Sequence, residues 1–280
     1  MSELPAVGLV AACDDPRLLG INLWPKQREW LETVEQGPRI HVWACGRRSA
    51  KTTTAALVGL WDCLFRPELS AFLLPGERRH AVAVAVNVKQ ARLFVSQAKA
   101  IVSRSPLLAE QIENVTEDSL SFRNDTVLSA FACSSRSARG WPLSTLLLDE
   151  AAHFLSETDG PQTAERVWEA LVPSTLQFGG AARIIVASTP YGEDGLFAQL
   201  FKQAASGELA DAVAQHATTA DCNPVVDAAF LDLERARDPD TYAHEYEAAF
   251  LGDGSAYLRG DVLDAAVAGR GELSPNGGLS

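Results

Sequence analysis

Short apolar runs, each followed by a turn or a longer helical pattern, recur along the first two hundred residues of the chain. The runs expected to form buried strands lie at 39–45, 81–87, 144–148 and 182–187. Helical patterns lie at 25–36, 51–65, 89–103, 163–171, 194–205, 227–237 and 240–249. This alternation is typical of α/β proteins, in which helices cover both faces of a sheet. The sequence therefore predicts an α/β fold with a mainly parallel central sheet.

The segment 119–132 departs from this alternation. Asn124 and Asp125 separate two runs rich in β-forming residues, which predicts a hairpin. After about residue 206 we expect no further strand, and glycines accumulate beyond residue 250. We therefore expect a core domain at 1–205, a small helical subdomain at 206–250 and a linker at 251–280.

Composition and charge limit the kind of protein. The chain has 280 residues, 47% of them hydrophobic, and lacks the run of roughly 18 apolar residues that would cross a membrane. Its five cysteines show no C-x-x-C pair and are expected to be reduced and mostly buried. The net charge is −12, whereas passive DNA-binding proteins usually have a basic surface. Any contact with nucleic acid must therefore be local, transient or made by an oligomer.

The sequence CGRRSAKTT at 45–53 joins the first predicted strand to a predicted helix. Such a junction points backbone N–H groups and the positive end of a helix dipole at one place, where phosphate can bind. Lys51 is expected to reach the β- and γ-phosphates of a nucleotide, and Thr52 to offer its hydroxyl to Mg²⁺. Cys45 and Ala50 replace the two glycines of the usual loop, and we expect Ala50 to be tolerated if its φ is negative. The letters alone fit an ordinary strand–turn–helix equally well.

A second motif, LLLDE at 146–150, places two carboxylates at the end of a buried strand. Ligands bind at this edge of an open parallel sheet. We expect Asp149 to join the Mg²⁺ shell and Glu150 to orient and deprotonate the attacking water. Acidic residues at the start of a helix are the alternative. The order and spacing of the two motifs favour an ATPase with one more strand between the motif strands, a place that the run 81–87 can fill.

Five segments in this order resemble the ATPase of the large terminase, the DNA-packaging enzyme of bacteriophages, and together they span nearly the whole chain. They are WPKQREWL (24–31), GRRSAKTT (46–53), SARGWPLSTLLLDEAAHF (137–154), ASTPYGEDGLF (187–197) and the segment 221–253. The resemblance implies a P-loop NTPase of the ASCE type with a small helical lid, which uses ATP and Mg²⁺.

The resemblance also implies roles for individual residues. The nucleotide would contact Gln27 at the edge of the adenine and the loop residues Gly46, Arg47, Arg48, Ser49, Ala50, Lys51, Thr52 and Thr53. Ser188 and Thr189 would sense the γ-phosphate, although a plain turn before Pro190 fits them equally well. Arg139 would act on the ATP of a neighbouring subunit, unless it only pairs with a surface carboxylate. Arg47 and Arg48 would instead stabilise the transition state in cis.

At the level of function, the resemblance implies a motor subunit that hydrolyses ATP to move double-stranded DNA into a procapsid in the host cytoplasm. Its partners would be further copies in a homo-oligomeric ring, expected to be a pentamer when docked, a portal protein and a small terminase subunit, with no membrane. The family adds a C-terminal nuclease after such a linker, so no nuclease activity is expected from this chain. Two alternatives remain open, another P-loop nucleic-acid translocase and a non-hydrolysing nucleotide-binding assembly module.

Overall fold

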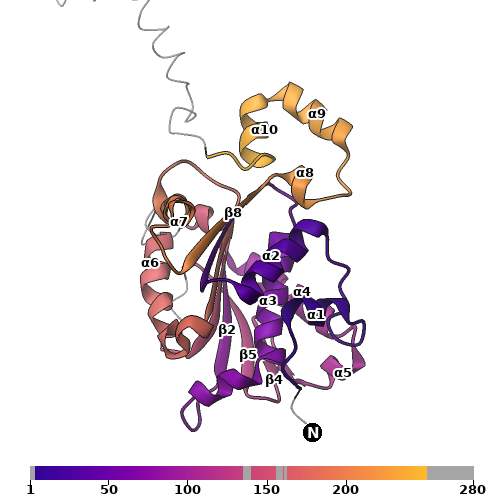
Figure 1. Ribbon diagram of the computed structural model, residues 1–280, viewed down its shortest axis with the longest axis vertical. Helices are drawn as coiled ribbons and strands as arrows, with labels where there is room; N and C mark the ends of the chain where they lie inside the picture. The colour runs from indigo at the N-terminus through magenta and orange to yellow at the C-terminus, as the bar shows by residue number, and fades with distance from the viewer. Residues whose placement is uncertain (1–3, 135–139, 156–159, 161–162, 251–280) are drawn as a thin grey trace, which may run out of the picture.

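The centre of the protein is one eight-stranded sheet with the strand order β3-β4-β5-β2-β6-β7-β1-β8 (Figure 1). The computed structural model describes residues 4–134, 140–155, 160 and 163–250. The strands are β1 (Ile40–Cys45), β2 (Arg79–Ala85), β3 (Ile112–Val115), β4 (Ser119–Phe122), β5 (Thr126–Ala132), β6 (Leu143–Asp149), β7 (Arg183–Ser188) and β8 (Ala212–Ala217). From β5 to β8 all neighbouring strands are parallel, and β3-β4-β5 pair antiparallel. The predicted α/β class and mainly parallel sheet are confirmed.

Helices cover both faces of this sheet. They are α1 (Leu9–Asp14), α2 (Pro25–Gln36), α3 (Lys51–Phe65), α4 (Val88–Val102), α5 (Pro106–Ala109), α6 (Thr163–Leu171), α7 (Gly195–Ser206), α8 (Thr219–Cys222), α9 (Ala228–Arg237) and α10 (Pro239–Glu245), with 3₁₀ helices η1 (Pro67–Phe72), η2 (Ala151–His153) and η3 (Val172–Ala181). Figure 1 shows α1 to α4 on one side of the sheet and α6 and α7 on the other. Residues 219–250, which include α8 to α10, lie beyond one end of the sheet and are called the lid. No described helix is long and apolar enough to span a membrane.

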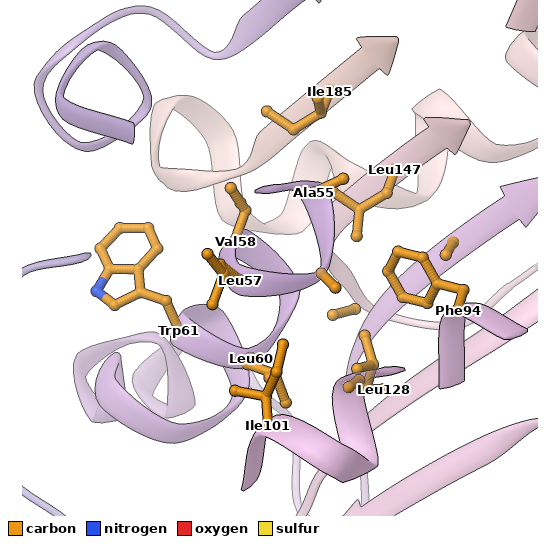
Figure 2. Close-up of a cluster of buried hydrophobic side chains, with 14 of the residues drawn as sticks. Ala55, Leu57, Val58, Leu60, Trp61, Phe94, Ile101, Leu128, Leu147 and Ile185 are labelled. Carbon is orange, nitrogen blue, oxygen red and sulfur yellow. The ribbon is translucent and has the colours of Figure 1, made fainter. Parts of the chain in front are cut away.

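The helix that carries Lys51 is held deep in the core. Thirteen of the 15 residues of α3 are buried, and Figure 2 shows its apolar side chains against Leu128, Leu147 and Ile185 of the sheet. The fit is close at Gly59, where an added Cβ would lie 2.9 Å from Leu128 Cδ1. Alternate residues of the strands face this core and a second one under α6 and α7, as the two-residue period of a strand requires. This packing fixes where α3 begins, and therefore where Lys51 lies.

The strand between the two motif strands is β7, so its assignment to the run 81–87 was wrong. β7 pairs with β1 from Ile184 opposite Ile40 and with β6 from Arg183 opposite Thr145. The run 81–87 forms most of β2, which lies on the other side of β6. Both runs are apolar on both faces, so their patterns do not distinguish a position between the motif strands from one beside them. The insertion of one strand is nevertheless present.

The expectation that strands stop after residue 206 was also wrong, because β8 pairs in parallel with β1 along its whole length. Its sequence, AVAQHA, consists of small and polar residues that are half-buried at the edge of the sheet, which weakens the apolar signal. The expected boundary at 205 therefore precedes a strand of the sheet. The helix expected at 240–249 ends at Glu245, and Ala248 has a φ of 55°. The predicted hairpin is present as β4 and β5, whereas the linker at 251–280 lies outside the described residues.

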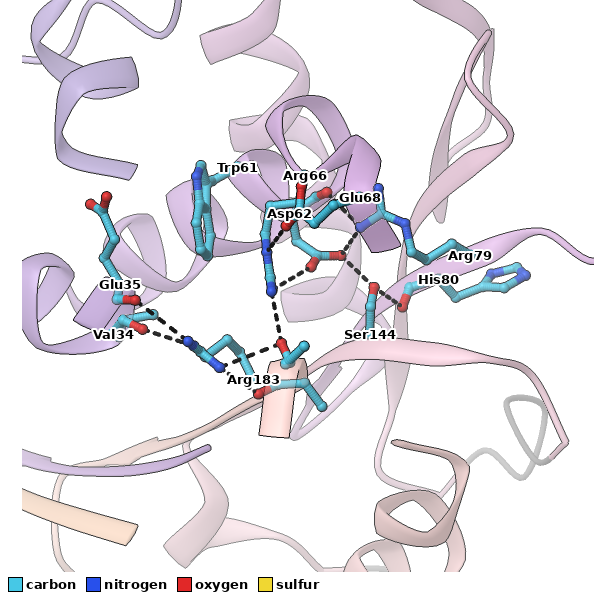
Figure 3. Close-up of polar contacts among 12 residues, drawn as sticks. Val34, Glu35, Trp61, Asp62, Arg66, Glu68, Arg79, His80, Ser144 and Arg183 are labelled. Carbon is cyan, nitrogen blue, oxygen red and sulfur yellow. Dashed lines mark hydrogen bonds and ion pairs between the residues drawn. The ribbon is translucent and has the colours of Figure 1, made fainter. Parts of the chain in front are cut away.

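A buried polar cluster lies where β2 and β6 begin, at the opposite end of these strands from Asp149 (Figure 3). Asp62 of α3 is fully buried and accepts hydrogen bonds from Arg66 and Arg79, each at 3.2 Å, and from Ser144. Nearby, Arg183 donates to backbone carbonyls, among them that of Val34 at 2.8 Å. Asp62 is therefore the shared counter-charge of two buried guanidinium groups.

Candidate nucleotide-binding site

The loop between β1 and α3 contains two residues in the left-handed conformation. Arg48 has a φ of 60°, and Ala50, the residue just before α3, has a φ of 61°. The expectation of a negative φ at Ala50 was therefore wrong. A side chain in this region costs roughly 1–2 kcal/mol because its Cβ approaches the following carbonyl oxygen. Ala50 adopts the conformation for which the usual loop has glycine, and it bears this strain.

Replacing Ala50 with Gly should raise the free energy of unfolding by about 1 kcal/mol, because glycine adopts positive φ without this strain. Urea denaturation at neutral pH measures the change. Ala100, exposed within α4, is the matched control, and Ala100→Gly should lower stability by about 1 kcal/mol. A destabilised Ala50→Gly variant would show that the loop does not need positive φ at this position.

Lys51 and Glu150 form an ion pair at the start of α3. Lys51 Nζ lies 2.8 Å from Glu150 Oε1 and 3.5 Å from Thr189 Oγ1, and Lys51 is only 6% exposed. Burial alone would raise the pKa of Glu150, but the charge and hydrogen bond of Lys51 hold that pKa below its usual value. The other Glu150 oxygen accepts hydrogen bonds from Ser188 Oγ and the Thr189 N–H, both at 3.3 Å. The glutamate therefore contacts both the phosphate loop and the end of β7.

Asp149 and Thr52 are joined directly, with Thr52 Oγ1 donating to Asp149 Oδ2 at 2.8 Å. Asp149 is 8% exposed, and its Oδ1 has no hydrogen-bond partner among the described residues. Burial, and then the neighbouring Glu150, raise the pKa of Asp149 to about 6. A buried carboxylate oxygen without a donor, beside a threonine hydroxyl, fits Mg²⁺, which prefers such oxygen ligands. The described residues contain no group of three His, Cys, Asp or Glu side chains that could hold a metal, so phosphate and water would complete the shell.

A cavity of about 400 Å³ brings these groups together. It is lined by Arg47, Arg48, Lys51, Val86, Gln90, Glu150, His153 and Thr189. The strands β1, β2, β6 and β7 all end at this edge, as expected of a ligand site on a parallel sheet. Sequence reasoning missed Val86 and Gln90. Their signal was their place directly after β2, where Asn87 caps the start of α4 by accepting from the Gln90 N–H.

The lid is bonded to the phosphate loop. The Arg47 N–H donates to the Glu245 carbonyl at 2.7 Å, and the two side chains form an ion pair. Thr219 Oγ1 donates to the Arg47 carbonyl at 2.7 Å. A Cβ on Gly46 would lie 2.7 Å from the Thr219 nitrogen, which is too close. The close approach of the lid therefore explains the glycine at 46, one position later than in the usual loop.

The remaining predicted residues lie around this centre. Gln27 is 5% exposed; its Oε1 accepts from the Trp24 N–H and its Nε2 donates to Thr54 Oγ1, both at 3.0 Å. Its contact with adenine stays a prediction. Ser49 is fully buried in the loop, and the Thr53 hydroxyl lies 3.5 Å from Gln97 Oε1 of α4. Arg139 lies outside the described residues.

The strand order and the site define the class of protein. One strand separates the phosphate-loop strand from the acidic strand, and that strand, β7, ends in residues that contact the glutamate. This is the fold of a P-loop NTPase of the ASCE type.

Comparison with solved structures narrows the fold further. The chain is similar to the Thermus phage P74-26 large terminase ATPase domain, with a TM-score of 0.60, 21% identity and 83% of this chain and 96% of that chain covered. For the HK97 bacteriophage large terminase the TM-score is 0.63, with 17% identity, 82% of this chain and 51% of that chain covered. A large terminase from a thermophilic bacteriophage in complex with ATP-gamma-S gives 0.54, 14%, 82% and 53%. No protein-family model and no curated sequence matches. The chain has the fold of the ATPase domain of phage large terminases.

Proposed function

We propose that this protein is the ATPase of a phage DNA-packaging motor. The observation that carries the proposal is the convergence of Lys51 and Thr52 with Asp149 and Glu150 at one cavity, where the Thr52 and Asp149 side chains are 2.8 Å apart. These are the groups that phosphoryl transfer from ATP to water requires. Solved structures with the same fold include complexes with ATP-gamma-S and with ADP, which supports nucleotide binding.

The residues suggest how hydrolysis proceeds. The phosphate loop and Lys51 bind the β- and γ-phosphates, and Thr52 and Asp149 hold Mg²⁺, which neutralises phosphate charge when bound. Glu150, ionised because its pKa is lowered, accepts a proton from the attacking water. The water oxygen bonds to the γ-phosphorus while the bond from that phosphorus to the bridging oxygen breaks. Lys51 must transfer its charge from Glu150 to phosphate, so nucleotide binding frees the base.

The test combines a binding titration with a phosphate-release assay. We expect the protein to bind ATPγS with Mg²⁺ and to release phosphate from ATP, and we expect Lys51→Ala to weaken binding at least tenfold. Lys89, an exposed lysine outside the loop, provides the control variant Lys89→Ala. Failure of the wild type to bind nucleotide would refute the proposal. Binding without phosphate release, even with DNA and the assembled oligomer, would favour the non-hydrolysing assembly module.

The exposed face of α4 is where we propose DNA contact. Residues 78–109 contain six Lys and Arg residues and no Asp or Glu, although the whole chain has a net charge of −12. Lys89, Lys99 and Arg104 are exposed and have no acidic partner among the described residues. Lys89 and Lys99, separated by about 15 Å along the helix, lie on the face opposite its buried residues. A row of unpaired cations fits the phosphates of double-stranded DNA.

Lys99→Glu should therefore weaken binding of the protein to a DNA duplex and reduce the slope of log K against log salt concentration by about 0.9. Fluorescence anisotropy from 25 to 150 mM salt measures both quantities. Lys202→Glu on α7 changes the net charge equally and is the matched control. Equal losses in the two variants would leave only a general charge effect and exclude this face.

We further propose that the chain acts as a homo-oligomeric ring, with Arg139 reaching the ATP of the next subunit and with a portal protein and a small terminase subunit as partners. The ring would translocate double-stranded DNA into a procapsid in the host cytoplasm. The support is the resemblance of the motif segments together with the terminase ATPase fold.

A further inference from the structure

We propose that Tyr191 positions the lid over the phosphate loop by packing between His153 and His244. This inference rests on the proposed ATPase function, since the histidines flank groups assigned to nucleotide chemistry. The Tyr191 ring centroid lies 5.3 Å from that of His153 and 6.0 Å from that of His244. The rings come from three elements, namely η2 after the acidic strand, the segment after β7, and α10 of the lid.

Each ring is close in sequence to a residue at the cavity. His153 lies three residues after Glu150, and Tyr191 lies two residues after Thr189, whose N–H donates to Glu150. His244 directly precedes Glu245, which pairs with Arg47 of the phosphate loop. The three rings therefore connect the surroundings of the catalytic glutamate to the lid residue that holds the loop. A displacement of Thr189 or Glu150 would reach α10 through Tyr191.

The exposure of Tyr191 supports a positioning role over simple core packing. The residue is 65% exposed, so its burial contributes little to the hydrophobic core. No hydrogen bond of its hydroxyl occurs among the described residues, so the ring itself makes the contacts. The lid is also held by Arg47 and Thr219, so removal of the Tyr191 ring should loosen α10 without unfolding it.

Hydrogen exchange of the backbone amides at 238–247, followed by mass spectrometry, tests the inference without nucleotide and with saturating ATPγS and Mg²⁺. In Tyr191→Ala we expect three- to tenfold faster exchange in this segment, as the loss of two aromatic contacts predicts. Tyr191→Phe should exchange like the wild type because it keeps the ring. Phe230→Ala, which removes another exposed aromatic ring of the lid from α9, is the control and should leave 238–247 unchanged.

The nucleotide arm separates positioning from local packing. We expect ATPγS to slow exchange at 238–247 in the wild type and in Tyr191→Phe, and to have less than half of this effect in Tyr191→Ala at full occupancy. Equal exchange in Tyr191→Ala and the wild type, with and without nucleotide, would overturn the inference. If no variant binds ATPγS, the proposed function fails, while the comparison without nucleotide still decides whether Tyr191 holds the lid.

Discussion

Glu150→Gln should lower the rate of ATP hydrolysis by about 10²–10⁴-fold, the contribution typical of a general base, and leave the affinity for ATPγS within threefold. Glutamine preserves the shape of the side chain but cannot accept the proton of the attacking water. It also removes the ion pair with Lys51, whose ammonium then has only the phosphates as a charged partner. Single-turnover phosphate release and a parallel binding titration separate the chemical step from nucleotide affinity.

Glu110→Gln is the matched control, because Glu110 is exposed at the end of α5, away from the cavity. Its hydrolysis rate should equal that of the wild type. Wild-type turnover in Glu150→Gln would assign the base to another group, and His153, which also lines the cavity, would be the next residue to replace.

Asp62→Ala should lower the free energy of unfolding by about 3–5 kcal/mol, the loss typical of breaking a buried ion pair. The substitution leaves Arg66 and Arg79 buried without their shared counter-charge, and it removes the acceptor of Ser144. Urea denaturation at neutral pH measures the change. Arg79 is 1% exposed and already has two N–H groups without partners among the described residues, so it has no other described carboxylate to turn to.

Asp232→Ala, on the exposed side of α9, is the control and should change stability by less than 0.5 kcal/mol. The cluster and the nucleotide cavity lie at opposite ends of β6, so folded Asp62→Ala protein should bind ATPγS like the wild type. A loss of stability below 1 kcal/mol would mean that water reaches the two guanidinium groups.

The parts of the fold that the sequence predicted are those that local pattern determines. The bounds of α2, α3 and α6 match the predicted ranges because apolar period and flanking residues define a helix within its own segment. The two motifs were found because residues that follow buried parallel strands gather at one edge of the sheet. That rule placed Lys51 near Glu150 although they are 99 positions apart.

The features that were missed depend on contacts between distant segments. Which apolar run lies between β1 and β6 is decided by pairing across the whole sheet, and a run such as β2 carries no record of its neighbours. The glycine at 46 is explained by Thr219, and the half-buried β8 by its pairing with β1. The left-handed conformation of Ala50 runs against residue preference and could not be expected from its identity.

The position of β7 has a mechanical consequence. Ser188 pairs with Ala44 of β1, and the preceding residue, Ala187, pairs with both Trp43 of β1 and Asp149 of β6. Sliding β7 would break hydrogen bonds on both sides at once, so this strand is a fixed anchor shared by the two motif strands. Motion that follows loss of the γ-phosphate must therefore begin beyond Ser188, as rotation about the backbone on either side of Pro190. The sheet is the stationary frame of the motor, and the power stroke belongs to the segments attached to its edge.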